Sequence, residues 1–259
     1  MSGMGANYDL LRLLVVREVR VRYARAALGV SWAVFQPLVL LVIFTALGLE
    51  NFVGERSKFA GTPYPALTWC GLIFWIQFAQ GTLTGTSSIA LARDILHKSR
   101  FPAELIPLSR VLAWLLDLAI GLVLLVPLLA YYDLPFHATA LLIPVVFLAQ
   151  LAFTIGVALF LSALNLFFRD VHYMVTALMP VIMFASNVVW PLDHLTGWKG
   201  TLFGLNPIVS YIEAYRTLLF LGELPSLAVL APGLIGAVVA LVFGLAYFRR
   251  VRPRFAEEV

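Results

Sequence analysis

The sequence predicts an all-α membrane protein with six transmembrane helices. Hydrophobic residues make up 61% of the 259 residues and charged residues only 12%, whereas a soluble domain is roughly half apolar and about a quarter charged. So little charge cannot cover a water-soluble globule of this size. A bilayer core needs roughly 20 apolar residues of helix, and six segments are long enough. They are 31–49, 66–90, 105–132, 139–168, 173–191 and 228–248.

The first segment, 31–49, is longer than the hydrophobic region of a cleaved signal peptide, which is about 7 to 15 residues. It also lacks a small-residue cleavage site and ends in LGLENF. We therefore expect it to be retained as the first span. Because backbone polar groups in lipid must be paired within their own segment, all six spans should be helices.

Residues 7–28 precede the first span and carry Arg17, Arg20, Arg22 and Arg25. A basic arm alone would also suit nucleic acid, but one joined directly to an apolar span indicates a membrane surface, so no nucleic-acid partner is expected. Valines alternate with arginines here as in a strand, yet the flanking LLRLLVV and ARAAL favour helix. We predict an amphipathic helix that lies in the membrane interface.

The basic residues are distributed unequally between the two sides of the predicted spans. Of the 18 lysines and arginines, 14 fall in the N-terminal arm, in the connections after spans two and four, and in the tail. Cytoplasmic loops carry such an excess of positive charge. Both termini are therefore predicted to be cytoplasmic, and the chain is expected to form one transmembrane domain over 1–259.

Gly81, Gly85 and Ser88 form a small-residue face on the second span, which allows helices to approach closely. The sequence leaves open whether this face packs within one chain or between two copies. The connection 90–105 that follows is charged, and Asp94 and Lys98 are spaced to support a short helix. It is either a solvated loop or a helix that docks a soluble partner.

Asp117 is the only acidic residue well inside a predicted span. Such a residue suggests a functional role by default, and Arg110, two turns away, is a candidate partner. A proton relay would need further ionisable groups along the same path. A hydrogen-bonded contact between helices is the favoured interpretation.

The segment 195–220 is apolar, but Lys199, Glu213 and Arg216 argue against a seventh span because charges at mid-bilayer cost roughly 2.5 to 3.5 kcal/mol each. We predict short helices, broken at Asn206-Pro207, that lie at or dip into the outer leaflet. Glu213 and Arg216 are spaced to pair one turn apart.

Catalytic and metal sites have no candidate residues. The glycine-rich piece at 81–88 lacks the lysine and spacing of a phosphate-binding loop, no nucleophile motif occurs, and the four histidines lie in separate connections without metal-ligand spacing. Cys70, the single cysteine, excludes an internal disulfide and is interpreted as a small buried hydrophobe.

Aromatic residues are abundant, and a path lined by their faces would suit sugar rings, although core packing explains them equally well. The candidates are Phe35, Phe74, Trp75 and Phe78.

Four ordered blocks resemble a known family. The first runs through REV at 17–19, VRY at 21–23, LGVSWA at 28–33 and QPL at 36–38; the others are RFPAELIPL at 100–108, LN through FRDV at 164–171, and LNP at 205–207. Together they are similar to permease subunits of ATP-binding-cassette exporters for cell-surface polysaccharides, in the O-antigen and teichoic-acid branch. The resemblance covers essentially the full length.

This resemblance implies a homodimer in the bacterial inner membrane, which works with two copies of a separate ATPase that binds ATP and Mg²⁺. The chain itself would be a transport subunit without cofactor, and not an enzyme. Its substrate would be a polysaccharide on an undecaprenyl diphosphate carrier. An exporter of drugs or small lipids, an ATP-independent scramblase or channel, and a membrane enzyme of lipid-linked sugars are the alternatives.

The resemblance also implies roles for particular residues. The helix between spans two and three would couple to the ATPase through Arg93, Asp94, His97, Lys98 and Arg100. The arginines Arg17, Arg20, Arg22 and Arg25 would bind the lipid diphosphate, since arginine offers fixed bidentate donors. The external re-entrant helices would form a gate with Asn206, Pro207, Glu213 and Arg216, and the four aromatic residues named above would line the channel.

Overall fold

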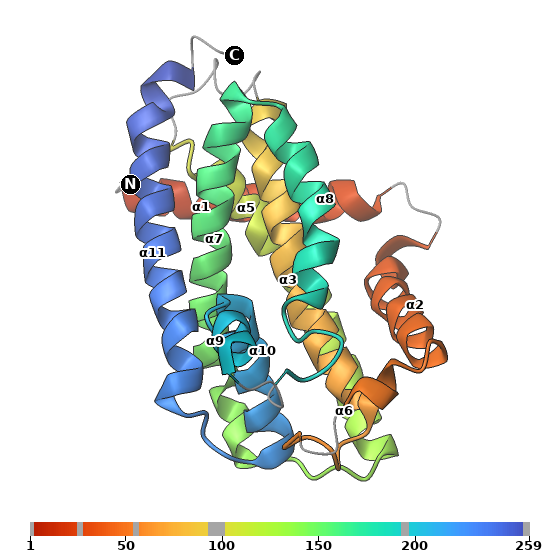
Figure 1. The fold of residues 1–259 in the computed structure, drawn as a ribbon. Helices are drawn as coiled ribbons and strands as arrows, with labels where there is room; N and C mark the ends of the chain where they lie inside the picture. The colour runs from red at the N-terminus through yellow and green to blue at the C-terminus, as the bar shows by residue number, and fades with distance from the viewer. Residues whose placement is uncertain (1–2, 25–27, 54–56, 93–101, 193–196, 256–259) are drawn as a thin grey trace.

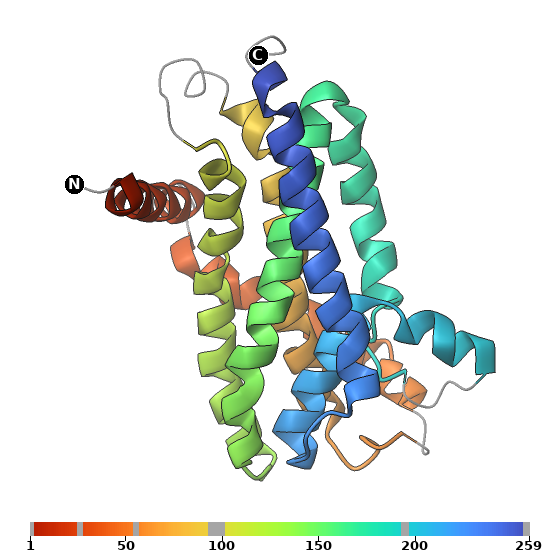
Figure 2. The ribbon, with the colours of Figure 1, turned by 90° about the vertical axis from the view of Figure 1, so that its left-hand side faces the viewer.

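A computed structural model describes residues 3–24, 28–53, 57–92, 102–192 and 197–255. In these ranges all regular secondary structure is helical. Figures 1 and 2 show long helices that run side by side along one axis, with α1 (Gly3–Tyr23) lying across them. Both termini lie toward the same end of the bundle.

The long helices correspond in order to the predicted spans. They are α2 (Trp32–Ala46), α3 (Tyr64–Leu91), α5 (Leu105–Ala113) with α6 (Leu115–Tyr131), α7 (Ile143–Phe167), α8 (Asp170–Phe184) and α11 (Leu227–Val251). Short 3₁₀ turns flank several of them: η1 (Gly29–Ser31), η2 (Leu49–Phe52), η3 (Ala138–Leu142) and η5 (Arg252–Arg254).

Four helical segments in the described ranges are long and apolar enough to cross a bilayer: Gly29–Ala46, Leu105–Tyr131, Ala138–Phe167 and Leu227–Arg254. They confirm a multi-pass membrane protein. The helix α8 is apolar but shorter. In contrast, α3 is long but less apolar, since it contains polar residues such as Gln77, Thr82 and Thr86. These side chains are fully buried in protein, because the other helices enclose α3.

Two helices differ from the predicted spans. The fifth helix, α8, ends at Phe184 rather than near residue 191, and Asn187 follows in a left-handed conformation with φ of 42°, which asparagine tolerates better than most residues. The third span is broken at Trp114, whose N–H bonds to the carbonyl of Val111 instead of the residue four positions back. These two irregular points position the candidate sites described below.

The small-residue face of α3 packs within the chain. A methyl group at Gly85 would lie 2.7 Å from the Cβ of Ala158 on α7, and one at Gly81 would lie 3.3 Å from Thr154. The opposite side of α7 approaches α11 equally closely, since a methyl group at Gly156 would lie 2.3 Å from the main chain of Ala240. As a result α3, α7 and α11 form one closely packed layer, consistent with their order in Figure 1.

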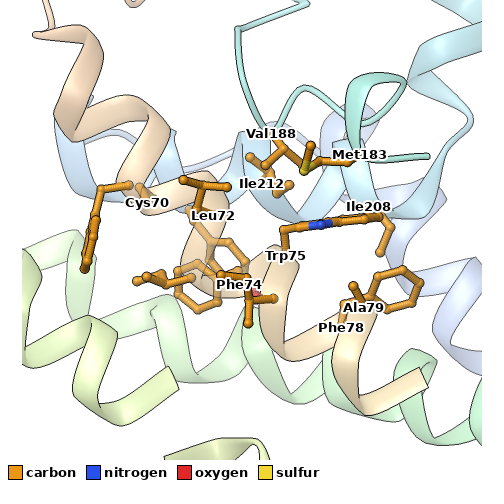
Figure 3. Packing of buried hydrophobic residues seen from close by; sticks show 14 of the residues in the cluster. Cys70, Leu72, Phe74, Trp75, Phe78, Ala79, Met183, Val188, Ile208 and Ile212 are labelled. Carbon is orange, nitrogen blue, oxygen red and sulfur yellow. The ribbon is translucent and has the colours of Figure 1, made fainter. Parts of the chain in front are cut away.

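The main hydrophobic core lies where α3 meets α6, α8 and α10 (Pro207–Arg216). Figure 3 shows part of it, with Trp75 directed toward Ile208. Cys70 is fully buried in this core, which confirms its interpretation as a small buried hydrophobe.

The segment 197–221 contains α9 (Gly197–Gly204), α10 and the π-helical turn η4 (Thr217–Leu221). The predicted break at Asn206-Pro207 is confirmed, because α10 begins at Pro207 and Asn206 is its N-cap. In Figure 1, α9 and α10 lie in the half of the bundle away from the two termini.

Candidate functional site

The C-terminal end of α1 is fixed to the break in the third span. Arg22 donates from Nη1 to Oδ2 of Asp117 across 2.7 Å, and its guanidinium lies 3.5 Å from the centroid of the Trp114 ring. Tyr23 donates its hydroxyl to the other carboxylate oxygen of Asp117. Burial and the adjacent carboxylate raise the pKa of Tyr23 to about 12, so the phenol keeps the proton that it donates. Asp117 therefore makes the expected contact between helices.

A second ion pair lies beside the first. Arg110 of α5 pairs with Glu18 of α1, and both side chains are largely buried. The candidate pairing of Arg110 with Asp117 does not form, because α1 supplies the opposite charge to each of them: Glu18 to Arg110 and Arg22 to Asp117. The sequence pattern could not reveal this, since α1 and α5 are far apart in the chain.

The other arginines of α1 have exposed side chains. Arg17 and Arg20 are exposed, whereas Arg25 lies outside the described residues. Arg12 is exposed as well, at the edge of a cavity of about 380 Å³ between α1 and the third span. The cavity is otherwise lined by apolar side chains, among them Val15, Val19, Leu115 and Leu116. This arrangement can hold an anionic headgroup next to an apolar chain.

At the other end of the bundle, Asn206 and Pro207 fix the start of α10. The Asn206 side chain accepts from the N–H of Ile208 at 3.0 Å and donates to Oγ of Ser186 at 2.8 Å. Pro207 packs on α11, where a methyl group at Gly236 would lie 2.6 Å from its ring. The cap thus joins α10 to the turn that follows α8.

Arg216 is fully buried at the end of α10. Its guanidinium donates to the carbonyl oxygens of Leu67, Asn187 and Val188, at 2.6 to 3.2 Å. These three carbonyls come from α3 and from the turn after α8, so one side chain connects three elements. The left-handed conformation of Asn187 directs consecutive carbonyls toward the same cation.

Glu213 pairs with Lys58 at 2.7 Å, and Lys58 also donates to Thr217 at 3.1 Å. The expected pair of Glu213 with Arg216 is therefore wrong. Each finds a partner from another element, because Lys58 arrives from the segment between α2 and α3 while backbone carbonyls surround Arg216. The sequence analysis did not identify Lys58 as a partner of Glu213, because nothing in the local sequence relates two residues so far apart in the chain.

The four aromatic candidates lie in different surroundings. Phe35 is 48% exposed on α2, whereas Phe74, Trp75 and Phe78 are at most 5% exposed in the core. Phe74 stacks on Tyr215 at 3.7 Å between ring centroids. Tyr215 in turn donates to Gln150 at 2.9 Å, in a buried polar group with Gln77 that the sequence analysis also missed.

The proposed docking residues Arg93, Asp94, His97, Lys98 and Arg100 lie outside the described residues. The structure describes the helices on either side of them, α3 and α5, whose adjoining ends lie toward the same end of the bundle as the chain termini. Among the described residues, no group of three His, Cys, Asp or Glu side chains is arranged to hold a metal ion.

Comparison with known proteins gives a consistent result over most of the chain. The family model described as ABC-2 type transporter matches residues 9–220. The O-antigen export system permease protein RfbA of Myxococcus xanthus is 33% identical, over 96% of this chain and 95% of the relative. A protein of the same name from Klebsiella pneumoniae is 28% identical over 98% and 96% of the two chains. The polysialic acid transport protein KpsM of Escherichia coli is 22% identical over 96% and 95%.

Proposed function

The chain belongs to the ABC-2 type transporter family, and we propose that it is the permease subunit of an ATP-driven exporter of polysaccharide carried on undecaprenyl diphosphate. The observation that carries this proposal is the full-length similarity to an O-antigen export permease. The more distant similarity to a polysialic acid transport protein supports a glycan rather than a drug or a small lipid. The chain is a transport subunit and not an enzyme.

In the proposed topology, six spans cross the bacterial inner membrane: α2, α3, α5 with α6, α7, α8 and α11. Both termini are cytoplasmic, and α1 lies in the cytoplasmic interface. The excess of basic residues at the end of the bundle that holds the termini supports this orientation. The position of α1 across the other helices supports an interfacial helix.

The active complex contains two copies of this chain and two copies of a separate ATPase that binds ATP and Mg²⁺. The connection between α3 and α5 docks the ATPase through Arg93, Asp94, His97, Lys98 and Arg100. The connection carries charges of both signs, three basic residues and two acidic ones, which would suit a protein surface. The connection leads directly into α3, the helix at the centre of the bundle, so its movement would reach the core.

At the cytoplasmic interface, Arg17 and Arg20 are the exposed arginines that would meet the lipid diphosphate, together with Arg25. Arg22 would join them only after leaving Asp117, so its first role is to orient α1. The apolar cavity beside Arg12 would accept part of the lipid chain. This combination of exposed cations and an apolar cavity matches a ligand with a charged head and a long hydrocarbon chain.

On the external side, α9 and α10 form the re-entrant gate. Asn206 and Pro207 set its hinge, and the contacts of Glu213 and Arg216 hold it against α3. Phe35 would line the channel in this conformation because its ring is exposed. Phe74, Trp75 and Phe78 would contact the glycan only after α10 and α8 move away from α3.

The test is export in vesicles that contain this chain and its ATPase, loaded with lipid-linked glycan extracted from the cells that encode them. We compare the wild type with an Asp94→Ala, Lys98→Ala, Arg100→Ala variant. The matched control removes three exposed charges from the opposite end: Glu50→Ala, Lys199→Ala, Glu223→Ala. Export that needs ATP and fails only in the first variant supports the proposal. Export without ATPase or nucleotide would favour a scramblase or channel instead.

A further inference from the structure

A second hydrophobic cluster, separate from the main core, lies at the end of the bundle that holds the C-terminus. At its centre are Phe248 of α11, fully buried, and Phe255, only 3% exposed just after η5. Their rings contact edge to face, with centroids 5.2 Å apart. We call this group, with the residues packed around it, the C-terminal cluster.

The C-terminal cluster contacts both ends of the connection between α3 and α5. On the α3 side it includes Ile89 and Ala92, and on the α5 side Ala103 and Ile106, all of them buried. A phenylalanine outside the cluster would expose its ring to water or lipid. Here the ring of Phe255 instead joins the residues that precede and follow the connection.

An ionic contact reinforces the cluster. Glu104, the residue before α5, lies 3.6 Å from Arg249 and 3.6 Å from Arg252. The Glu104 side chain is only 18% exposed, whereas both arginines are more open. The end of α11 and the turn that follows it are thus bound to the start of α5 by opposite charge as well as by apolar packing.

The cluster also includes Leu159, Ala163 and Leu166 of α7. The helices α7 and α11 approach so closely that a methyl group at Gly244 would lie 2.1 Å from the carbonyl oxygen of Gly156, and we expect two helices in such close contact to move together. A displacement that reaches the cluster is therefore transmitted to α7 and α11 together.

We propose that Phe255 and Glu104 are positioning residues for energy coupling: they hold both ends of the connection between α3 and α5 against α7 and α11, so that a movement imposed by the ATPase shifts the helices as one unit. The inference rests on the proposed function. Without these contacts the connection still docks, but its displacement is absorbed locally. ATP is then hydrolysed with little export.

The experiment measures glycan exported per ATP hydrolysed in the same vesicles as above. Phe255→Ala and Glu104→Gln are compared with Phe243→Ala, which removes a 57% exposed ring from α11. We expect ATP hydrolysis to remain and the export ratio to fall at least about fivefold, the low end of typical coupling effects. Phe255→Leu, which keeps an apolar side chain, should restore most of the ratio.

Parallel loss of hydrolysis and export in both variants, or an unchanged ratio in both, would overturn the inference. If Phe255→Ala does not assemble with the ATPase, Glu104→Gln decides the matter, since it preserves the shape of the side chain. Failure of the proposed function itself is distinguishable, because the wild type would then export the glycan without ATP or would not export it at all.

Discussion

Arg22 and Asp117 lie 95 positions apart in the chain, yet their side chains meet at 2.7 Å. The contact joins the transverse helix α1 to the third span at the point where that span is broken. The guanidinium of Arg22 lies over the ring of Trp114, the residue at the break. Together with the pair of Glu18 and Arg110, this contact holds α1 in its orientation across the bundle.

Replacing Arg22 by alanine should destabilise the protein, because it leaves the buried carboxylate of Asp117 without its cation. Breaking a buried ion pair from one side costs roughly 3 kcal/mol or more, so we expect Tm to fall by about 5 to 10 °C. The measurement is thermal unfolding of the purified protein in detergent. Arg20→Ala, which removes an exposed arginine from the same helix, is the control and should leave Tm unchanged. Equal Tm values for the two variants would contradict the conclusion that the ion pair of Arg22 and Asp117 stabilises the fold.

Replacing Arg216 by lysine should destabilise the protein, although the positive charge is retained. A lysine has a single nitrogen and cannot reach the three carbonyls that the fixed guanidinium contacts. We expect a loss of about 3 kcal/mol, together with faster proteolysis of the segment that contains α9 and α10. Lys199→Ala on exposed α9 is the control. A protease pattern like that of the wild type would show that the carbonyl contacts do not hold α10.

The glycines between α7 and α11 should not tolerate a methyl group. Gly156→Ala or Gly244→Ala would place a carbon 2.1 to 2.4 Å from main-chain atoms, which must then move. We expect each to cost about 1 to 3 kcal/mol, the usual range for overpacking. Gly204→Ala is the matched control, because nothing lies within 4 Å of a methyl group there. Unfolding midpoints of the three variants provide the test.

Cys70 should be unreactive in the folded protein, since it is fully buried in the main core. A membrane-permeant maleimide should modify it only after denaturation. Leu13→Cys, at a position 67% exposed on α1, is the positive control and should react at once. Rapid labelling of the wild type would mean that α3 is open to water or lipid at this point.

The topology can be tested by single cysteines in a Cys70→Ala background. A maleimide that cannot cross membranes should label cysteines at positions 199 and 223 from outside intact cells. Cysteines at positions 169 and 250 should react only after the membrane is opened. All four positions are exposed, so accessibility of the side chain does not bias the result. Labelling of position 250 in intact cells would contradict either the number of spans or the assigned orientation.

Much of the fold follows from the sequence because it depends on local properties. Apolar length predicts helices that cross a bilayer, and the described helices follow the six predicted segments in order. The break before α10 was also predictable, since Asn206 caps the helix and Pro207 suits its first turn. By contrast, the end of α8 could not be predicted, because the apolar sequence continues beyond Phe184.

By itself, the sequence determined the class of protein, the order of the helices and the family, since composition, helix length and motif spacing are properties of neighbouring residues. Only the tertiary structure decided which charges meet. Local spacing suggested Arg110 with Asp117 and Glu213 with Arg216, but packing of distant helices brought Glu18, Arg22 and Lys58 to them. Backbone carbonyls accept hydrogen bonds from Arg216, and because every residue has a carbonyl, no sequence pattern marks the ones that a buried cation will use.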